Sequence, residues 1–437
     1  MFNLAPHDGV KPMKNPTRTS QTVAIAALAT LALSSCGGGG GGEDGDVELR
    51  FTWWGGSERA AYTQEIIDAF EEENPGITVS AEFDSWEGYW DSLATQTAGQ
   101  DTPDIIQMDA VYIREYIDNG ILLDLDQVDT SALPDELVAD GELDGQLFGM
   151  PIGSTTATIM TNPDVFDEAG VDLPDDETWT WDDLAEIGGQ ISESADARGQ
   201  GRPFGDAGMT LWLRQNAGVD MTDEEGQIAF EPEDVVPYFE RIQQLEEDGV
   251  ISSGDQVNED RAQALEQTMI ATGGAAMDGI WWDTQSIALS SNDGIDLTPV
   301  MPPSETGSAE DAQLWYKASM FYSAYAGTDH PEEAQLFIDF LVNNEEAGQL
   351  QQLERGIPSN EDIREAIRDD LDEAEAELLD YSEGLEDVVA DGPPLPPQGF
   401  GSVQEIVFRY EEQVLFGQSS AEEAAQQMHS EIESVLQ

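Results

Sequence analysis

Alternating strand-like and helix-like patterns between residues 47 and 119 restrict the fold more than any other part of the chain. Short runs rich in β-branched and aromatic residues predict strands, and longer runs with apolar residues at helical spacing predict helices. The predicted strands cover residues 47–54, 77–83 and 104–108, and the predicted helices cover residues 60–73, 86–96 and 111–119. A strand–helix–strand–helix–strand order predicts an α/β fold with a parallel sheet and right-handed crossover connections.

The composition is that of a folded but extremely acidic chain. The 437 residues carry a formal net charge of −75, yet 39% of them are hydrophobic and 10 are tryptophans, so the chain can build sizeable cores. The acidic residues are spread along the chain, which is typical of a solvated surface adapted to salty surroundings rather than of one cation site. Such a surface repels phosphates, which excludes nucleic acid as a partner.

Cysteine and histidine are too scarce for a metal cluster. Cys36 is the only cysteine, and the three histidines are scattered along the chain. The sequence has no zinc-protease, P-loop or serine-hydrolase motif, and the run Gly37–Gly42 lacks the preceding strand of a dinucleotide-binding loop. We therefore expect no metal and no cofactor.

The N-terminal residues have the parts of an export signal. Positive residues precede an apolar run, Val23–Leu33, that is too short to span a bilayer, and translation could start at Met1 or at Met13. The segment Leu33–Cys36 resembles the lipobox of bacterial lipoproteins, in which the cysteine thiol is acylated. The alternative is an ordinary secretory signal with an incidental cysteine.

The lipobox resemblance implies how the N-terminus is processed. Residues 1–35 are then a signal peptide, Cys36 carries acyl chains such as palmitate, and residues 36–46 are the lipidated cysteine and its glycine-rich linker. The expected location is extracytoplasmic, with the body anchored to the outer face of the cell membrane.

A series of short motifs follows along the rest of the chain, and their order and spacing are more specific than any one of them. The motifs are Leu49–Gly55, Asn74–Val79, Thr102–Asp109, Phe148–Pro151, Thr161–Gly170, Thr178–Leu184, Gly273–Met277, His330–Leu341 and Arg355–Ser359. Together they resemble the extracellular solute-binding proteins (family 1, sugar-binding type) of bacterial ABC importers. Thr161 and Pro163 depart from the family pattern, which commonly has an aromatic residue and a lysine there.

The resemblance implies an α/β, two-lobe periplasmic-binding-protein-like fold of type II, with the ligand cleft between the lobes. Lobe 1 is expected to comprise residues 47–154 and 318–362, and lobe 2 residues 155–317 and 363–437. It also implies a monomeric, non-catalytic receptor that delivers its ligand to the transmembrane subunits of an ABC permease.

Candidate ligand-binding residues in lobe 1 follow the predicted strands, because ligand sites favour the carboxyl ends of parallel strands. They are Trp54, Glu58, Trp86, Tyr89 and Asp109. Trp53 and Trp54 should point to opposite faces of the sheet, so that one of them is a core residue. Each candidate has a structural alternative: core packing for the aromatic residues, and a charge or cap at a helix start for Glu58 and Asp109.

Lobe 2 and the lobe connections supply the other candidates, which are Trp212, Asp278, Trp281, Trp282, Lys317 and Arg355. The resemblance implies a sugar-stacking aromatic residue after the strand that contains Ala275–Met277, which places it at Trp281 or Trp282. Lys317 is the only lysine beyond the N-terminal signal, and its alternative role is an ion pair with one of the many acids.

Three functions fit these residues to different degrees. The expected function is capture of a mono- or oligosaccharide, because aromatic rings cover the apolar faces of sugars and carboxylates bind their hydroxyl groups. Carboxylates and rings also suit a polyamine or another cationic solute. An exported glycoside hydrolase with two carboxylates is the third alternative, and the full-length resemblance to receptors disfavours it.

Overall fold

The computed structural model describes residues 47–290 and 295–436, and residues 45–437 form one compact unit. The predicted signal peptide, Cys36 and the linker up to residue 46 lie outside the described residues. No helix of the described part of the chain is long and apolar enough to cross a membrane.

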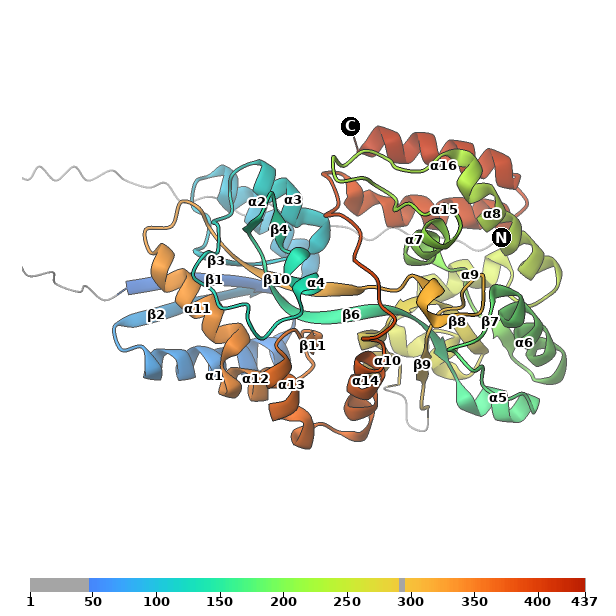
Figure 1. The fold of residues 1–437 in the computed structure, drawn as a ribbon, viewed down its shortest axis with the longest axis horizontal. Helices are drawn as coiled ribbons and strands as arrows, with labels where there is room; N and C mark the ends of the chain where they lie inside the picture. The colour runs from blue at the N-terminus through green and yellow to red at the C-terminus, as the bar shows by residue number, and fades with distance from the viewer. Residues whose placement is uncertain (1–46, 291–294, 437) are drawn as a thin grey trace, which may run out of the picture. The chain divides into compact units, whose positions relative to one another are not determined.

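Eleven strands are described, and most of them join one mixed sheet. They are β1 (Val47–Trp54), β2 (Ile77–Asp84), β3 (Ile105–Met108), β4 (Glu142–Leu143), β5 (Gln146–Leu147), β6 (Met150–Thr161), β7 (Arg198–Gln200), β8 (Ala275–Trp282), β9 (Thr298–Val300), β10 (Tyr316–Ala324) and β11 (Ile357–Pro358). The main sheet runs in the order β2-β1-β3-β10-β6-β8-β7, with β9 and β11 paired to β6, while β4 and β5 form a separate hairpin (Figure 1).

The α-helices surround the two ends of this sheet (Figure 1). They are α1 (Ser57–Glu73), α2 (Trp86–Ala98), α3 (Ala110–Asp118), α4 (Asp135–Ala139), α5 (Pro163–Ala169), α6 (Trp181–Ser194), α7 (Gly205–Asn216), α8 (Pro232–Glu247), α9 (Gly254–Arg261), α10 (Ser286–Leu289), α11 (Pro331–Asn343), α12 (Glu345–Gln351), α13 (Glu361–Ile367), α14 (Glu373–Glu383), α15 (Val403–Leu415) and α16 (Ala421–Val435). The longest helices belong to α/β connections or to the layer around α8, α15 and α16.

The first three strands confirm the predicted parallel arrangement. β1 pairs in parallel with β2, where Leu49 lies opposite Val79, and with β3, where Phe51 lies opposite Ile105. The sheet becomes mixed because β10 returns from the far end of the chain and runs antiparallel to β3 and to β6. A β-strand that comes back from a distant segment was not predicted from local patterns.

The first half of the fold, which contains β1, β2, β3 and β10, has an apolar layer on each face of its sheet. On one face, Phe51, Phe70 and Phe337 pack edge to face or tilted between the sheet and α1 and α11. On the other face, α2 and α3 cover the sheet with residues such as Tyr89 and Leu93. Trp53 is buried in the first layer and Trp54 packs into the second, as the alternation of a strand predicts.

The second half of the fold has its own large core between α5–α8 and the C-terminal helices α15 and α16. Trp181 begins α6 after Thr180, which caps the helix and forms a capping box with Asp183. Tyr238 and Arg261 both bind the buried carboxylate of Glu411 on α15, at 2.6 and 2.5 Å. Aromatic packing and one paired internal charge thus join the helices of this half.

The two halves share the strand β6, all of whose residues are buried. Its first part pairs with β10 and β11, and its last part pairs with β8 and β9 (Figure 1). The acidic stretch from residue 361 to residue 383 is helical and is divided into α13 and α14 by a short break. Asp372 caps α14, and Arg368 before the break pairs with Asp380 and so ties the two pieces together.

Candidate functional site: a cavity between the two halves

Three adjoining cavities lie where the two halves face each other. The central cavity has a volume of about 130 Å³. Its walls come mainly from α3, α7, β8, β10 and the segment 393–396. The lining residues are Ala110, Val111, Asp140, Asp206, Ala207, Thr210, Met221, Thr222, Trp282, Trp315, Lys317, Phe321, Pro393, Pro394, Leu395, Pro396 and Phe400. Elements far apart in the sequence therefore converge on one space.

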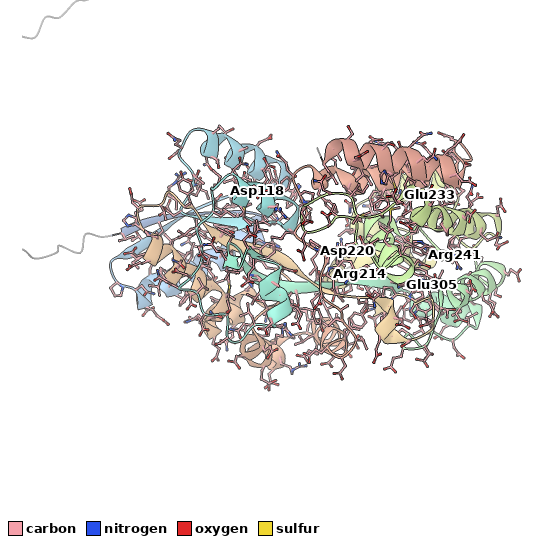
Figure 2. All side chains as sticks on the ribbon, turned by 45° about the horizontal axis from the view of Figure 1, so that its top comes forward. Asp118, Arg214, Asp220, Glu233, Arg241 and Glu305 are labelled. Atoms are coloured by element: carbon pink, nitrogen blue, oxygen red, sulfur yellow. The ribbon has the colours of Figure 1, made fainter. Side chains whose placement is uncertain are left out.

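Aromatic side chains form much of the central cavity. Trp282 ends β8, and its ring meets that of Trp315 edge to face, with the ring centroids 6.2 Å apart. The guanidinium of Arg214 lies 5.1 Å from the Trp315 ring and is paired with Asp220 (Figure 2). Phe400 follows the proline-rich segment and supplies a further ring. These rings present apolar surface to any ligand in the cavity.

Polar groups are few in the central cavity, and they come from both halves. The ammonium of Lys317 lies 5.1 Å from the ring centroid of Trp282 and donates to its neighbouring carbonyl, Ala318 O, at 3.3 Å. Asp140 accepts a hydrogen bond of 2.7 Å from the Ala318 N–H, and Asp206 accepts one of 3.1 Å from the Gln404 amide. Lys317 forms no ion pair within 4 Å among the described residues, so it has donors left for a ligand.

Burial changes the acidity of both carboxyl groups. It raises the pKa of Asp140 to about 7, although the Ala318 N–H and the nearby charge of Lys317 oppose the shift. It also raises the pKa of Asp206, against the opposing effects of the Gln404 hydrogen bond and of Lys317. Asp140 therefore changes its charge near neutral pH.

Two further cavities share walls with the central one. The second has a volume of about 170 Å³ and shares Asp206, Ala207 and Trp282 with the central cavity. The third has a volume of about 410 Å³ and shares Asp140 and the residues 393–395. Because they share walls, we treat the three cavities as one groove.

The described residues that line the groove include no serine, cysteine or histidine. The groove therefore lacks the hydroxyl or thiol nucleophile paired with histidine that acyl transfer requires. No group of three or more potential metal ligands is found in the described part of the chain. Rings, a few hydrogen-bonding groups and an enclosed volume are instead what a small-molecule binding site contains.

Comparison with known proteins agrees with a binding site. The family of bacterial extracellular solute-binding proteins matches residues 54–348. The chain belongs to this family. Its family and fold are those of binding proteins rather than of enzymes, and it is a solute-binding protein of the ABC-transporter type that acts outside the cytoplasm.

Several relatives of this solute-binding protein share its sequence or its fold. A binding protein of Brucella abortus is 26% identical over 164 residues, which cover 37% of this chain and 38% of that protein. A family 1 extracellular solute-binding protein from Alicyclobacillus acidocaldarius is 26% identical, with a TM-score of 0.75 over 90% of this chain and 99% of the other. A periplasmic oligogalacturonide binding protein from Yersinia enterocolitica has a TM-score of 0.75 at 23% identity, over 89% of this chain and 99% of the other, and shows the fold alone.

The lobe 1 candidates of the solute-binding protein lie outside the groove. Tyr89 is a core residue whose hydroxyl donates to Gln107 O at 2.5 Å, so it is not available to a ligand. Asp109 accepts a hydrogen bond from the Val111 N–H and so caps α3. The helix cap was the structural alternative to a ligand contact for this residue. Trp54 and Trp86 pack edge to face against each other, and Trp86 is 42% exposed. The side chain of Glu58 lies outside the described residues.

Arg355, Trp212 and Asp278 are also buried and do not line the groove. Arg355 has no exposed surface and lies inside the first half. Trp212 is a core residue of the second half, and its indole N–H donates to Asp234 O. Asp278 is fully buried and paired with Arg202 at 2.8 Å. None of these three candidates lines the groove.

Three candidates do line the groove. Trp282 and Lys317 face the central cavity, and Trp281 faces the second cavity. Trp281 is the less available of the two tryptophans, because Arg202 covers its ring at 4.0 Å and its N–H donates to Asp278. Of the two tryptophans, Trp282 is therefore the more accessible to a ligand in the groove.

Sequence reasoning missed the two carboxylates of the central cavity. Asp140 follows the short helix α4, and Asp206 lies in the first turn of α7. In a chain with 91 acidic residues nothing local distinguishes these two from surface acids. Gly205, directly before Asp206, has a φ of +69° in the structure, a conformation that favours glycine.

The change Asp140→Asn should make the protein more stable at alkaline pH. The folded-state pKa of Asp140 is about 7, above the usual 3.8, so the wild-type carboxyl costs stability as the pH rises from about 4 through 7. Asparagine can still accept the hydrogen bond from Ala318. Urea unfolding should show a gain on the order of 2 kcal/mol at pH 8 that disappears at pH 4.

The exposed residue Asp144 provides the matched control, since Asp144→Asn removes the same charge from the rim of the third cavity. Its unfolding curves should follow those of the wild type at both pH values. Parallel stability–pH curves for Asp140→Asn and the wild type would contradict the assignment of the titrating group.

Proposed function

We propose that this solute-binding protein captures a carbohydrate in the central cavity and presents it to an ABC permease. The observation that carries the proposal is the combination of Trp282, Trp315 and Phe400 with only three charged groups, Asp140, Asp206 and Lys317. Rings cover the C–H faces of a sugar, while carboxylates accept from its hydroxyl groups and the ammonium donates to them.

The size of the groove supports a ligand longer than one sugar unit. The central cavity continues into the second and third cavities through shared walls. The Yersinia enterocolitica protein that shares the fold is a binding protein for oligogalacturonides, which is consistent with an oligosaccharide here.

The proposed mechanism is closure of two lobes around the ligand. We propose lobe 1 as residues 47–154 with 318–362 and lobe 2 as residues 155–317 with 363–437, so that β6 and β10 connect them. A ligand that touches Asp140 in one lobe and Asp206 in the other favours the closed state, because it binds both only when they approach.

A thermal-shift and calorimetry screen of mono- and oligosaccharides with the purified protein tests the proposal. A ligand present at 100 times its dissociation constant should add about 2.7 kcal/mol to the free energy of unfolding. Absence of binding by every sugar class, together with binding of another solute, would overturn the carbohydrate assignment.

The third cavity favours a cationic solute as the second candidate, because it is lined by Glu136, Asp140, Glu142, Asp144, Glu224 and Asp391 with Arg114 as its one cation. The positive charge of Lys317 in the central cavity disfavours binding of a cationic solute there. Ionic strength separates the two candidates: affinity for a polyamine should fall steeply with added salt, and affinity for a neutral sugar should change little.

The change Cys36→Ser should release the protein from the membrane. If the thiol of Cys36 carries acyl chains, each buried CH₂ contributes about 0.8 kcal/mol to anchoring, and serine cannot be acylated in this way. Fractionation of cells should find the wild type in the membrane pellet and the variant in the soluble fraction. Equal membrane retention of both would argue for the incidental cysteine.

A further inference from the structure

A fully buried arginine in the first half has no acidic partner. The guanidinium of Arg355 donates only to neutral groups, which are Gln107 Oε1 at 3.2 Å, Tyr62 Oη at 2.7 Å, Thr63 Oγ1 at 3.0 Å and Gln351 Oε1 at 3.4 Å. None of the ion pairs within 4 Å in the described part of the chain includes it, although Arg355 has no exposed surface. A buried charge without a counter-charge is costly.

Four arginines of the described residues form no ion pair within 4 Å, and Arg355 is the only one of the four with no exposed surface. Eight arginines of the described residues form ion pairs with carboxylates: Arg50, Arg114, Arg202, Arg214, Arg241, Arg261, Arg368 and Arg409. Arg59, close to Arg355, donates instead to the carbonyl oxygens of Trp54 and Glu354. Burial and the charge of Arg355 both lower the pKa of Arg59, so two cations share this region.

Hydrogen-bond donors without acceptors surround the same face of the sheet. Trp53 Nε1, Gln107 Nε2 and Tyr322 Oη are buried and have no partner among the described residues. Gln107 lies opposite Tyr322 in the β3–β10 pairing, and the β1–β3 register places Trp53 beside Gln107. The guanidinium carbon of Arg355 lies 5.9 Å from the centroid of the Tyr322 ring. The Nε of Arg355 donates to Gln107 Oε1, which leaves the Nε2 of the same amide without a partner.

We propose that a small monovalent anion of halide size binds between Arg355, Gln107 and Tyr322. Trp53 Nε1 and Gln107 Nε2 can only donate and the Tyr322 hydroxyl can donate, so one acceptor suits all three groups. A water molecule could accept these bonds but would leave the guanidinium charge uncompensated, whereas an anion satisfies the donors and neutralises the charge. This site is separate from the groove and does not depend on the proposed carbohydrate function.

The position of the site links anion binding to the connection between the halves. The Arg355 carbonyl accepts from Ser319 Oγ on β10, and the next strand, Ile357–Pro358, pairs with β6. Both contacts involve the strands that run between the halves. An ion that fixes Arg355 therefore stabilises the junction through which the two halves are joined.

Halide titration of the whole protein tests the site. Sodium bromide replaces sodium gluconate at constant ionic strength, so that screening of the acidic surface stays the same. The wild-type unfolding temperature should rise and then saturate with bromide, as expected for a ligand that binds the native state. Crystals soaked in sodium bromide should show an anomalous peak beside Arg355 and Tyr322.

Tyr322→Phe separates an anion site from an unsatisfied hydroxyl. Removing a hydroxyl that binds nothing leaves stability unchanged or raises it, whereas removing a donor to an anion should weaken bromide binding about tenfold. Ser323→Ala is the matched control: Ser323 also has an unpartnered buried hydroxyl, but it points to the opposite face of β10. It should bind bromide like the wild type.

Two results would overturn the proposal. The first is a wild-type unfolding temperature that does not depend on bromide, or depends on it without saturation. The second is an equal bromide response in the wild type, Tyr322→Phe and Ser323→Ala, which would mark a general salt effect. The anomalous signal is measured on the wild type, so it decides the question even where a variant folds poorly.

Discussion

Trp282→Ala should weaken ligand binding on the order of a hundredfold, because central aromatic residues of a binding site contribute about 2–4 kcal/mol each. Trp282 is the tryptophan that lines both the central and the second cavity. Its loss removes the ring against which Trp315 packs and over which the Lys317 ammonium lies. Titration calorimetry with the ligand found in the screen measures the change in affinity.

Trp86→Ala provides the control for this variant. Trp86 is the most exposed of the tryptophans that the structure describes, at 42%, and it lies outside all three cavities. Its removal should change affinity less than about twofold. A large loss in Trp86→Ala with normal binding by Trp282→Ala would move the site from the central cavity to the aromatic cluster of α2.

Asp278→Asn should destabilise the second half by about 3 kcal/mol, since breaking a buried ion pair leaves an uncompensated charge. The Asp278 carboxylate has no exposed surface and accepts from the Arg202 backbone at 2.7 Å, from its guanidinium at 2.8 Å and from Trp281 Nε1 at 3.1 Å. Asparagine keeps the shape and loses the charge. Urea denaturation at pH 7 measures the difference in the free energy of unfolding.

The neighbouring Asp260 limits the size of this effect. Burial, and next the charge of Asp278, raise the pKa of Asp260, which also pairs with Arg202 at 3.3 Å. Without the charge of Asp278, Asp260 ionises more readily and partly replaces it.

An exposed ion pair serves as the control for Asp278→Asn. Asp182 is 89% exposed and pairs at 2.8 Å with Arg241 on α8. Asp182→Asn should cost less than about 1 kcal/mol, because solvent screens exposed pairs. Equal losses in the two variants would show that burial of Asp278 adds nothing to its pair.

Local patterns were sufficient for the strands and helices between residues 47 and 119. The strand predicted for residues 47–54 is β1 with the same bounds, and the next two strands differ by one residue at an end. The helix predicted for residues 60–73 begins earlier, at Ser57, because the turn at Gly55 and Gly56 is shorter than expected. Period-two and helical spacing are properties of a short segment, so they survive folding unchanged.

Side-chain exposure was the part that local patterns could not supply. Tyr89 and Trp86 share a helix face, yet Tyr89 is 2% exposed and Trp86 is 42% exposed, because only Tyr89 reaches the sheet and Gln107 O. Arg355 was a candidate because of its charge, but tertiary packing places it under α1 with Tyr62 and Thr63. Such contacts join residues nearly 300 positions apart.

By itself, the sequence determined the α/β class, the order of the first elements and the family, because these follow from segments that are contiguous in the chain. Only the tertiary structure decided that Asp140, Asp206, Lys317 and Trp282 surround one cavity. They come from four segments that meet because β10 returns to pair with β3 and β6. Long-range strand pairing brings them together, and no local pattern among 91 acidic residues marks which two carboxylates will be enclosed.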